Sequence, residues 1–189
     1  MIDINALRQD LKHFQCFSER EEKDREAMLK LLDTPKPFDR SQFEPGHFTG
    51  SAFVLSPDLD AILLIFHEKL KLWLQPGGHV DPTDPSMKAA AGRELAEETG
   101  VTQPLTHPKV EGPLAIDIHV IPPRKAEPEH LHFDIRYLFI APNTHIQAAS
   151  DALDARWVKF DAIDSLKTDE SVLNTVKRIQ YLLVSADQA

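Results

Sequence analysis

Cysteine, long apolar runs and positive charge are all scarce in this sequence. With one cysteine, Cys16, the chain cannot form an intrachain disulfide bond, which fits a reducing compartment. No apolar run approaches the roughly 20 residues of a membrane-spanning helix. The N-terminus also lacks the basic and apolar regions of a signal peptide. We therefore expect a cytoplasmic protein without a membrane span.

The shortage of positive charge narrows the range of partners. Lysine and arginine number 21 against 30 acidic residues, which gives a net charge of −9 and a pI of about 5.4. A long nucleic acid or an anionic membrane surface needs a basic face, so neither is an expected partner. A small phosphate ligand is still compatible with this charge, because a bound metal ion can reverse the local sign.

The 189 residues and 42% apolar content are those of one globular domain, with room for an appendage. Residues 3–33 have a helical pattern, with Ser18 as a plausible cap for a second helical stretch, and Pro35 and Pro37 stop it. We expect an N-terminal helical extension over residues 1–40 and the main domain over residues 41–189.

From residue 50 onward, strands and helices are mixed, which predicts an α/β or α+β class with a mixed sheet. Alternating apolar residues predict two strands that each bury one face, at residues 114–120 and 131–137. Asp169 is a good cap for a terminal helix over residues 169–184. The remaining expected elements are short strands at 52–55, 61–66, 72–74 and 157–160, and a helix at 85–99 ended by Gly100.

A loop followed by a helix carries the most informative chemistry. Asp84 is a good N-cap and Pro85 suits the first helical position. Glu94, Glu97 and Glu98 then follow at i, i+3 and i+4, so they share one helical face.

The phase of this helix opposes the simple interpretation of a solvated acidic face. At 100° per residue, Met87 and Ala91 lie within about 60° of Glu94, so the carboxylates continue the apolar stripe. Like charges clustered toward a core repel and raise one another's pKa unless a cation lies among them. The arrangement predicts a site for Mg²⁺, with Mn²⁺ able to substitute, and Arg93 can orient a carboxylate.

This stretch resembles the Nudix box, G-x5-E-x7-R-E-U-x-E-E-x-G-U, where U is aliphatic. The second half matches at every fixed position from Arg93 to Val101. In the first half, counting from Gly78, the first acidic position is Asp84 instead of Glu, and Arg93 arrives one residue late. The resemblance covers Gly78–Val101, with an insertion near the junction of loop and helix.

The resemblance implies an α/β/α sandwich around a mixed sheet and hydrolysis of a nucleoside diphosphate linked to another group. By transfer, Glu97 and Glu98 are the main metal ligands, and Glu94 is a further ligand or the base that activates water. Arg93 belongs to the catalytic set, and the carbonyl of Gly78, or alternatively that of Gly77, completes the metal site.

Several histidines and acids outside the helix are further candidates. His130, His132 and Asp134 alternate on one strand face, and histidines can bind metals or donate to phosphate, although a merely hydrogen-bonded polar face gives the same pattern. His79, inside the box, is a candidate substrate contact. For His47 we favour a surface loop. An acidic residue outside the box often assists Nudix catalysis, and the candidates here are Asp151, Asp154, Glu127 and Glu129.

Two side chains are expected to be structural. Trp73 is more typical of core packing than of base stacking. Cys16 falls in a predicted helix, far in sequence from the box, and a small buried hydrophobe is its simplest interpretation. Isopentenyl diphosphate isomerases, which share the Nudix fold, use a cysteine within the catalytic domain, and this chain has none there.

Two classes of function follow. The first is a metal-dependent pyrophosphohydrolase acting on a small nucleotide derivative, such as a nucleotide sugar, ADP-ribose or a nucleoside triphosphate. The second is a Nudix-fold module that senses a nucleotide or sugar without turnover. The intact carboxylates favour the enzyme, and the net charge weakens a third reading, RNA cap removal. The physiological substrate and a homodimeric state are left open by the sequence.

Overall fold

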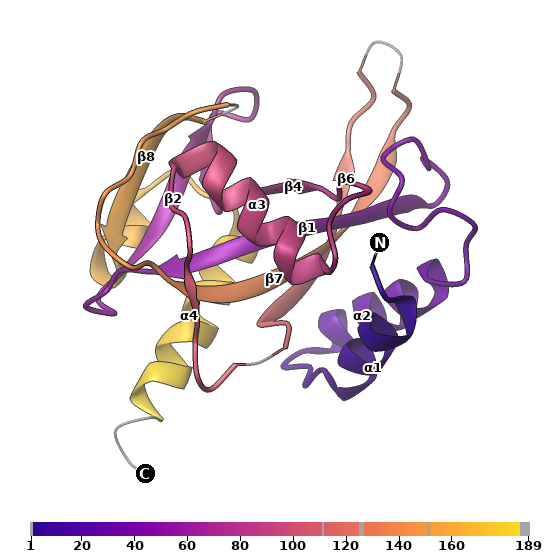
Figure 1. The fold of residues 1–189 in the computed structure, drawn as a ribbon, viewed down its shortest axis with the longest axis horizontal. Helices are drawn as coiled ribbons and strands as arrows, with labels where there is room; N and C mark the ends of the chain where they lie inside the picture. The colour runs from indigo at the N-terminus through magenta and orange to yellow at the C-terminus, as the bar shows by residue number, and fades with distance from the viewer. Residues whose placement is uncertain (1, 111, 125–126, 151, 186–189) are drawn as a thin grey trace.

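The computed structural model describes residues 2–110, 112–124, 127–150 and 152–185. Within these ranges, eight strands form one mixed sheet with helices on both sides (Figure 1). No helix in this described part is long and apolar enough to cross a membrane. The elements in chain order are α1 (Ile4–His13), α2 (Glu19–Leu31), β1 (Gly46–Leu55), β2 (Ala61–His67), β3 (Leu72–Leu74), β4 (Gly77–His79), α3 (Met87–Thr99), β5 (Leu105–Thr106), β6 (Ala115–Ile121), β7 (His130–Ile140), β8 (Ala152–Lys159), the 3₁₀ helix η1 (Phe160–Ser165) and α4 (Glu170–Val184).

A parallel pair, β1 and β7, forms the centre of the sheet. These strands pair in one unbroken register, from Gly46 opposite Leu131 to Leu55 opposite Ile140. The strand order is β3-β2-β1-β7-β5, with β4 paired to β1, β6 to β7 and β8 to β2. All pairs other than β1 with β7 are antiparallel. The mixed sheet expected from the sequence is therefore confirmed.

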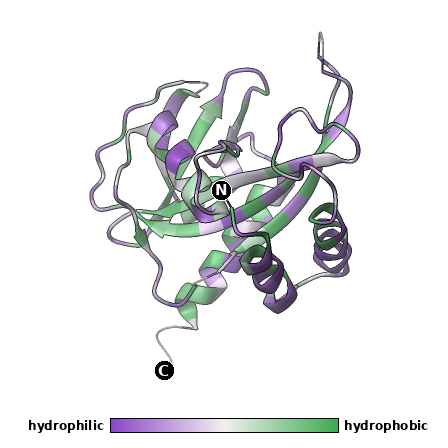
Figure 2. Ribbon diagram, turned by 45° about the vertical axis from the view of Figure 1, so that its right-hand side comes forward, coloured by the Kyte–Doolittle hydropathy of each residue, from purple (hydrophilic) through white to green (hydrophobic). Residues whose placement is uncertain are grey.

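Alternate residues of the central strands separate two apolar clusters. On one side, Ala52 and Val54 of β1 pack in a cluster with Met87 and Leu95 of α3 and with apolar residues of α1 and α2. On the other side, Phe53 of β1 lies in a cluster with buried residues of α4. The strands are largely hydrophobic, whereas α1 and α2 carry broad hydrophilic faces (Figure 2). These layers confirm the α/β/α arrangement.

The helix ends follow the sequence signals closely, but the N-terminal helical stretch is broken into α1 and α2. Ser18 caps α2 by accepting a hydrogen bond from the amide of Glu21, and Asp169 caps α4 in the same way through Ser171. Gly100 ends α3 with φ of 71°, in the left-handed region that favours glycine. The N-terminal stretch is two helices, so Cys16 lies half-buried between them and not in a helix as predicted.

Four strands differ from the sequence prediction: β1 and β4, discussed here, together with β5, which was not predicted, and β8, which begins at Ala152 instead of Trp157. The first strand begins at Gly46, six residues before the predicted start at Ala52, and it is buried along its whole length. The predicted loop after Pro76 contains β4, which pairs with β1 at Gly50 opposite Gly78. Both strands contain glycine and polar residues with low strand propensity, so tertiary pairing overrides the local signal. These two strands carry much of the candidate site.

Candidate functional site

Helix α3 is one regular helix, as predicted, but its cap is not the predicted residue. Ser86 is the N-cap, and its hydroxyl accepts a hydrogen bond from the amide of Ala89 at 3.1 Å. Asp84 cannot cap the helix because its carboxylate is engaged by Arg93 and by the amide of Asp81. The extra residue in the box is therefore absorbed in the loop before Ser86.

Arg93 forms hydrogen bonds to acidic side chains of the loop and of α3. Its Nε and Nη2 donate to the two oxygens of Asp84 at 3.2 and 3.1 Å. Its Nη1 donates to Glu94 at 2.9 Å and to Glu97 at 3.2 Å, and Nη2 also reaches the carbonyl of His79 at 2.8 Å. A guanidinium with both edges occupied has little rotational freedom. Arg93 thus holds two of the three predicted metal ligands in a fixed relation to the loop.

Replacing Asp84 with Asn should therefore disorder Arg93 and lower hydrolytic turnover by about tenfold, within the usual range for groups that orient a ligand. The matched control is Asp81→Asn in the same loop, since among the described residues the exposed carboxylate of Asp81 accepts hydrogen bonds from Thr83. Turnover and melting temperature should be measured for both variants. Equal turnover in Asp84→Asn and wild type would show that Asp84 is not required to orient the Arg93 side chain.

Gly77 and Gly78 allow carboxylates of α3 to lie close to the backbone of β4. Glu98 is buried, with 5% of its surface exposed, and accepts a hydrogen bond from the amide of Gly77 at 2.9 Å. A Cβ at Gly78 would lie 2.7 Å from the carboxyl carbon of Glu94, so no other residue fits without moving that carboxylate. Burial raises the pKa of Glu94, and the nearby Glu97 adds to the effect. Glycine is needed here because the backbone and a carboxylate approach so closely.

A cavity of about 1280 Å³ opens beside these groups. Gly77, Gly78, Glu94 and Glu98 line it, whereas Glu97 is half exposed and paired with Arg93. Although the chain is acidic overall, four cationic residues also line this cavity, namely Arg40, Lys69, Arg124 and Arg136, of which Arg136 is buried and paired with Asp134 and Asp117. The cavity therefore combines clustered carboxylates with separate positive charges.

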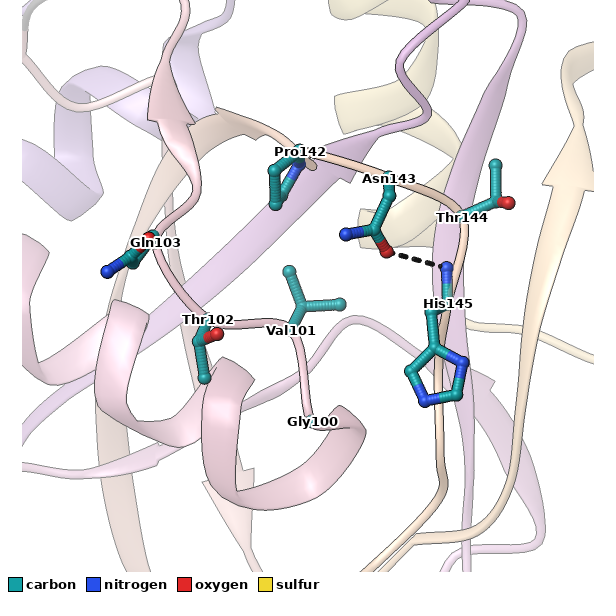
Figure 3. A pocket seen from close by; sticks show the side chains of 8 residues that line it. All are labelled: Gly100, Val101, Thr102, Gln103, Pro142, Asn143, Thr144 and His145. Atoms are coloured by element: carbon teal, nitrogen blue, oxygen red, sulfur yellow. Dashed lines mark hydrogen bonds between the residues drawn. The ribbon is translucent and has the colours of Figure 1, made fainter.

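A smaller cavity of about 580 Å³ lies at the C-terminal end of α3, away from the box carboxylates (Figure 3). His145 is the only ionisable residue of its lining, and its amide donates to the side chain of Asn143 at 2.9 Å. The lining residues are Gly100, Val101, Thr102, Gln103, Pro142, Asn143, Thr144 and His145. This lining has a single histidine and no carboxylate, so we place the candidate site in the larger cavity.

The predicted substrate contacts His79, His130 and His132 come together on one wall of the large cavity. His119 lies beside them, with its ring centroid 5.5 Å from that of His132. Burial lowers the pKa of His79 to about 4 and that of His132 to about 2, with neighbouring histidines adding to the effect. Both imidazoles are thus neutral near neutral pH.

The prediction for His47 is wrong. This residue is fully buried in β1, where it lies opposite His132 in the strand register. Its ring centroid is 4.9 Å from that of His132 and 5.2 Å from that of His130. Because the strand was predicted to begin at Ala52, nothing in the sequence pattern placed His47 in the sheet. The location of His47 could be predicted only by knowing that β1 pairs with β7, the strand that carries His130 and His132.

Asp134 belongs to a buried ion-pair network. Its carboxylate accepts from Arg136 at 3.0 Å, Ser51 at 2.8 Å and Thr49 at 3.1 Å. Arg136 in turn contacts Asp117 at 3.3 Å and donates to α4. Both carboxylate oxygens of Asp134 are therefore engaged by the protein itself.

The other candidate acids are spread over the surface. Asp154 forms an exposed ion pair with Arg156 on β8, and Glu129 is exposed. Glu127 lines the large cavity. Asp151 lies outside the described residues. Trp73 packs in the apolar cluster on the α4 side, with 9% of its surface exposed, which supports its structural interpretation.

Solved structures with the same fold are numerous. A NUDIX-family hydrolase from Clostridium perfringens is 23% identical, with a TM-score of 0.53 over 72% of this chain and 97% of that chain. A C. elegans Ap4A hydrolase binary complex is 15% identical, with a TM-score of 0.54 over 73% and 98%. The NUDIX domain of Shewanella oneidensis NrtR complexed with ADP ribose is 21% identical, with a TM-score of 0.51 over 84% and 98%. At these identities the likeness shows the fold alone.

Comparison with curated protein sequences gives no match. The family model for the NUDIX domain matches residues 47–178, which is more than half of the chain. This range runs from the first residues of β1 into α4, so it contains the loop, α3 and the histidine-bearing strands. The chain belongs to the Nudix family.

Proposed function

We propose that this protein hydrolyses a pyrophosphate bond in a small nucleoside diphosphate derivative and requires Mg²⁺. The observation that carries the proposal is the opening of the box carboxylates onto the large cavity. Glu94 and Glu98 line that cavity together with the glycine pair, and Arg93 fixes the adjacent Glu97. Family membership supports hydrolysis as the class of activity.

The donor set suits a hard divalent cation. Glu94, Glu97 and Glu98 offer only oxygen ligands, which Mg²⁺ and Mn²⁺ prefer, and the carbonyl of Gly78 would add another. The absence of a Cβ at Gly78 lets the Glu94 carboxylate lie directly against the backbone of β4. A bound Mg²⁺ neutralises pyrophosphate charge and lowers the pKa of water.

The remaining steps fall to the protein's own side chains. Glu94 is a further metal ligand or, alternatively, the proton acceptor, since it lines the cavity beside Gly78. Arg93 keeps Glu94 oriented through its Nη1. Arg40, Lys69 and Arg124 line the cavity, where they can pair with phosphate oxygens.

The size and lining of the cavity support a proposal for the substrate class. A volume of about 1280 Å³ accommodates a nucleotide with a second group attached to its diphosphate. Two structural neighbours are named for dinucleotide or nucleotide-sugar ligands, Ap4A and ADP ribose. We place nucleoside diphosphate sugars, ADP-ribose and dinucleoside polyphosphates ahead of polymeric RNA, given the net charge of −9.

The test is a product screen over these three substrate classes and nucleoside triphosphates, with Mg²⁺, with Mn²⁺ and with excess chelator. We expect cleavage of at least one compound with either metal and none with chelator. Full activity in chelator would contradict the assignment of the carboxylates to a metal. Tight nucleotide binding without any cleavage would favour the sensing module instead of the enzyme.

A further inference from the structure

Three histidines form a compact group that the box chemistry does not use. One ring nitrogen from each of His47, His130 and His132 lies within 4.8 Å of the other two. The sheet register produces this group, because His47 on β1 pairs with His132 on β7, and His130 precedes His132 by two residues on the same strand face. The positions are therefore set by the central parallel strands and not by a loop.

Backbone hydrogen bonds decide which nitrogen each ring can offer. Nδ1 of His47 lies 3.1 Å from the carbonyl oxygen of Gln42, and Nδ1 of His130 lies 2.8 Å from that of Pro128. A carbonyl only accepts, so both Nδ1 atoms must carry the proton and donate. In each neutral ring Nε2 is then a bare lone pair. This is the orientation that outer-sphere carbonyls impose on histidines that bind metals.

The ring nitrogens of the three histidines face one another in the interior of the protein. Nε2 of His47 and Nε2 of His132 are both buried, and neither has a hydrogen-bond partner among the described residues. Unpartnered buried polar atoms are rare and costly. A cation that accepts several lone pairs at once satisfies this arrangement.

We propose that His47, His130 and His132 bind a transition-metal ion of the Zn²⁺ class through their Nε2 atoms. Imidazole is a preferred ligand of Zn²⁺ and its neighbours in the first transition row, whereas Mg²⁺ prefers oxygen. Zn–N bonds of about 2.0–2.1 Å place tetrahedral nitrogens about 3.3 Å apart, so nitrogens that now lie within 4.8 Å must approach one another by up to about 1.5 Å on binding. The site is thus chemically distinct from the carboxylate site on α3.

Access to this site comes from the large cavity. His130 and His132 line it, while His47 closes the site from behind within the sheet. The ion would therefore have three protein ligands and a remaining position facing the space where Glu94 and Glu98 open. His79 lies between the two sites, with its ring centroid 5.0 Å from that of His132. Metal binding here stands independently of the proposed hydrolysis.

The direct test is metal titration of the full-length protein after chelator treatment, in buffer containing excess Mg²⁺ to occupy oxygen sites. Co²⁺ reports nitrogen-rich tetrahedral coordination by its strong visible absorption, and Zn²⁺ competition gives the affinity. We expect one equivalent of Co²⁺, displaced by Zn²⁺. Substituting Asn for His47, His130 or His132 should weaken Zn²⁺ binding by about 100-fold or more, since loss of an outer-sphere partner alone costs 10- to 100-fold.

Two controls separate this site from other metal binding. His145→Asn removes an exposed histidine at the other cavity, and Glu98→Gln impairs the carboxylate site. Both variants should bind Zn²⁺ as the wild type does. Zn²⁺ binding that is lost in Glu98→Gln, or retained at full strength when all three histidines are replaced, would overturn the proposal.

A second measurement on the wild type covers the case in which a histidine variant does not fold. Imidazole ¹⁵N spectra, recorded before and after one equivalent of Zn²⁺, should show Nε2 shifts for three histidines while Nδ1 of His47 and His130 remain protonated. The absence of any Nε2 shift would refute the site whatever the behaviour of the variants.

Discussion

Turnover of the best substrate should fall about 100- to 1000-fold in Glu98→Gln and in Glu97→Gln. Each change keeps the shape of the side chain but removes one charge from the proposed Mg²⁺ site. Charge stabilisation by a metal is worth several kcal/mol in the transition state, and each 1.36 kcal/mol is a factor of ten in rate. Steady-state kinetics at saturating Mg²⁺ measure the loss directly.

Stability measurements distinguish this effect from misfolding. The substitution relieves repulsion among neighbouring carboxylates, so the metal-free variants should melt at or above the wild-type temperature. Mg²⁺ should raise the melting temperature of the wild type by mass action and that of the variants less. Asp134→Asn is the comparison for turnover. It should cost far less activity than the Glu variants, because Asp134 is engaged by Arg136, Ser51 and Thr49. Near-normal turnover in both Glu variants would refute the site and favour a binding module.

The part of the site on α3 could be predicted from the sequence because its information is local. The spacing of Glu94, Glu97 and Glu98 fixes their common helical face, and the apolar residues around them fix which way it points. The structure agrees for Glu98, which is buried, and for Glu94, which is mostly covered, whereas Glu97 turns outward to Arg93. The helix phase alone could not separate these three environments.

The histidine group could not be predicted because its information is not local. His47 and His132 are far apart in sequence and meet only through the register of two parallel strands. Parallel pairing over a long connection has no short-range signal, in contrast to a hairpin. The segment Gly46–Ser51 belongs to a strand that is buried on both faces. Its glycines and polar residues have low strand propensity, so the sequence pattern did not predict it as a strand.

The cap of α3 shows a third kind of failure, a competition between two good candidates. Asp84 and Ser86 are both typical N-caps and lie two residues apart. The bidentate contact of Asp84 with Arg93 decides the outcome, since it engages both carboxylate oxygens and leaves the cap to Ser86. An ion pair across nine residues thus outweighs the local preference.

Replacing Arg136 with Met should lower the free energy of unfolding by about 3–5 kcal/mol, the usual cost of leaving a buried charge without its partner. The Arg136 side chain is only 3% exposed, and its guanidinium contacts Asp134 and Asp117. It also joins the sheet to α4 through hydrogen bonds to Ser171 and Thr175. Folded domains have only about 5–15 kcal/mol of stability in total, so this loss is a large fraction of it. Denaturant unfolding of both proteins measures the difference.

The same chain offers a matched control in Arg156→Met. Arg156 and Asp154 have the same two-residue spacing on a strand, but their side chains are 60% and 41% exposed. An exposed pair is worth about 0–1 kcal/mol, and the contact of Arg156 with the face of Trp73 adds about 0.5–1 kcal/mol. The loss in this control should therefore stay below about 2 kcal/mol. Equal losses in the two variants would show that burial does not set the strength of the Arg136 network.

The pH dependence of the Arg136→Met defect provides an independent check on its electrostatic origin. Burial opposes ionisation of Asp117, but the hydrogen bond from His119 and the charge of Arg136 outweigh it and hold the pKa of Asp117 below its ordinary value. A lowered folded-state pKa contributes stability above the ordinary pKa, and that contribution is lost as the pH falls through the folded-state value. Removing Arg136 raises the pKa of Asp117, so the variant accepts a proton at a higher pH than the wild type. The stability difference between them should accordingly shrink as the pH falls from about 7 to about 4, and a difference that is constant over this range would assign the defect to packing and not to charge.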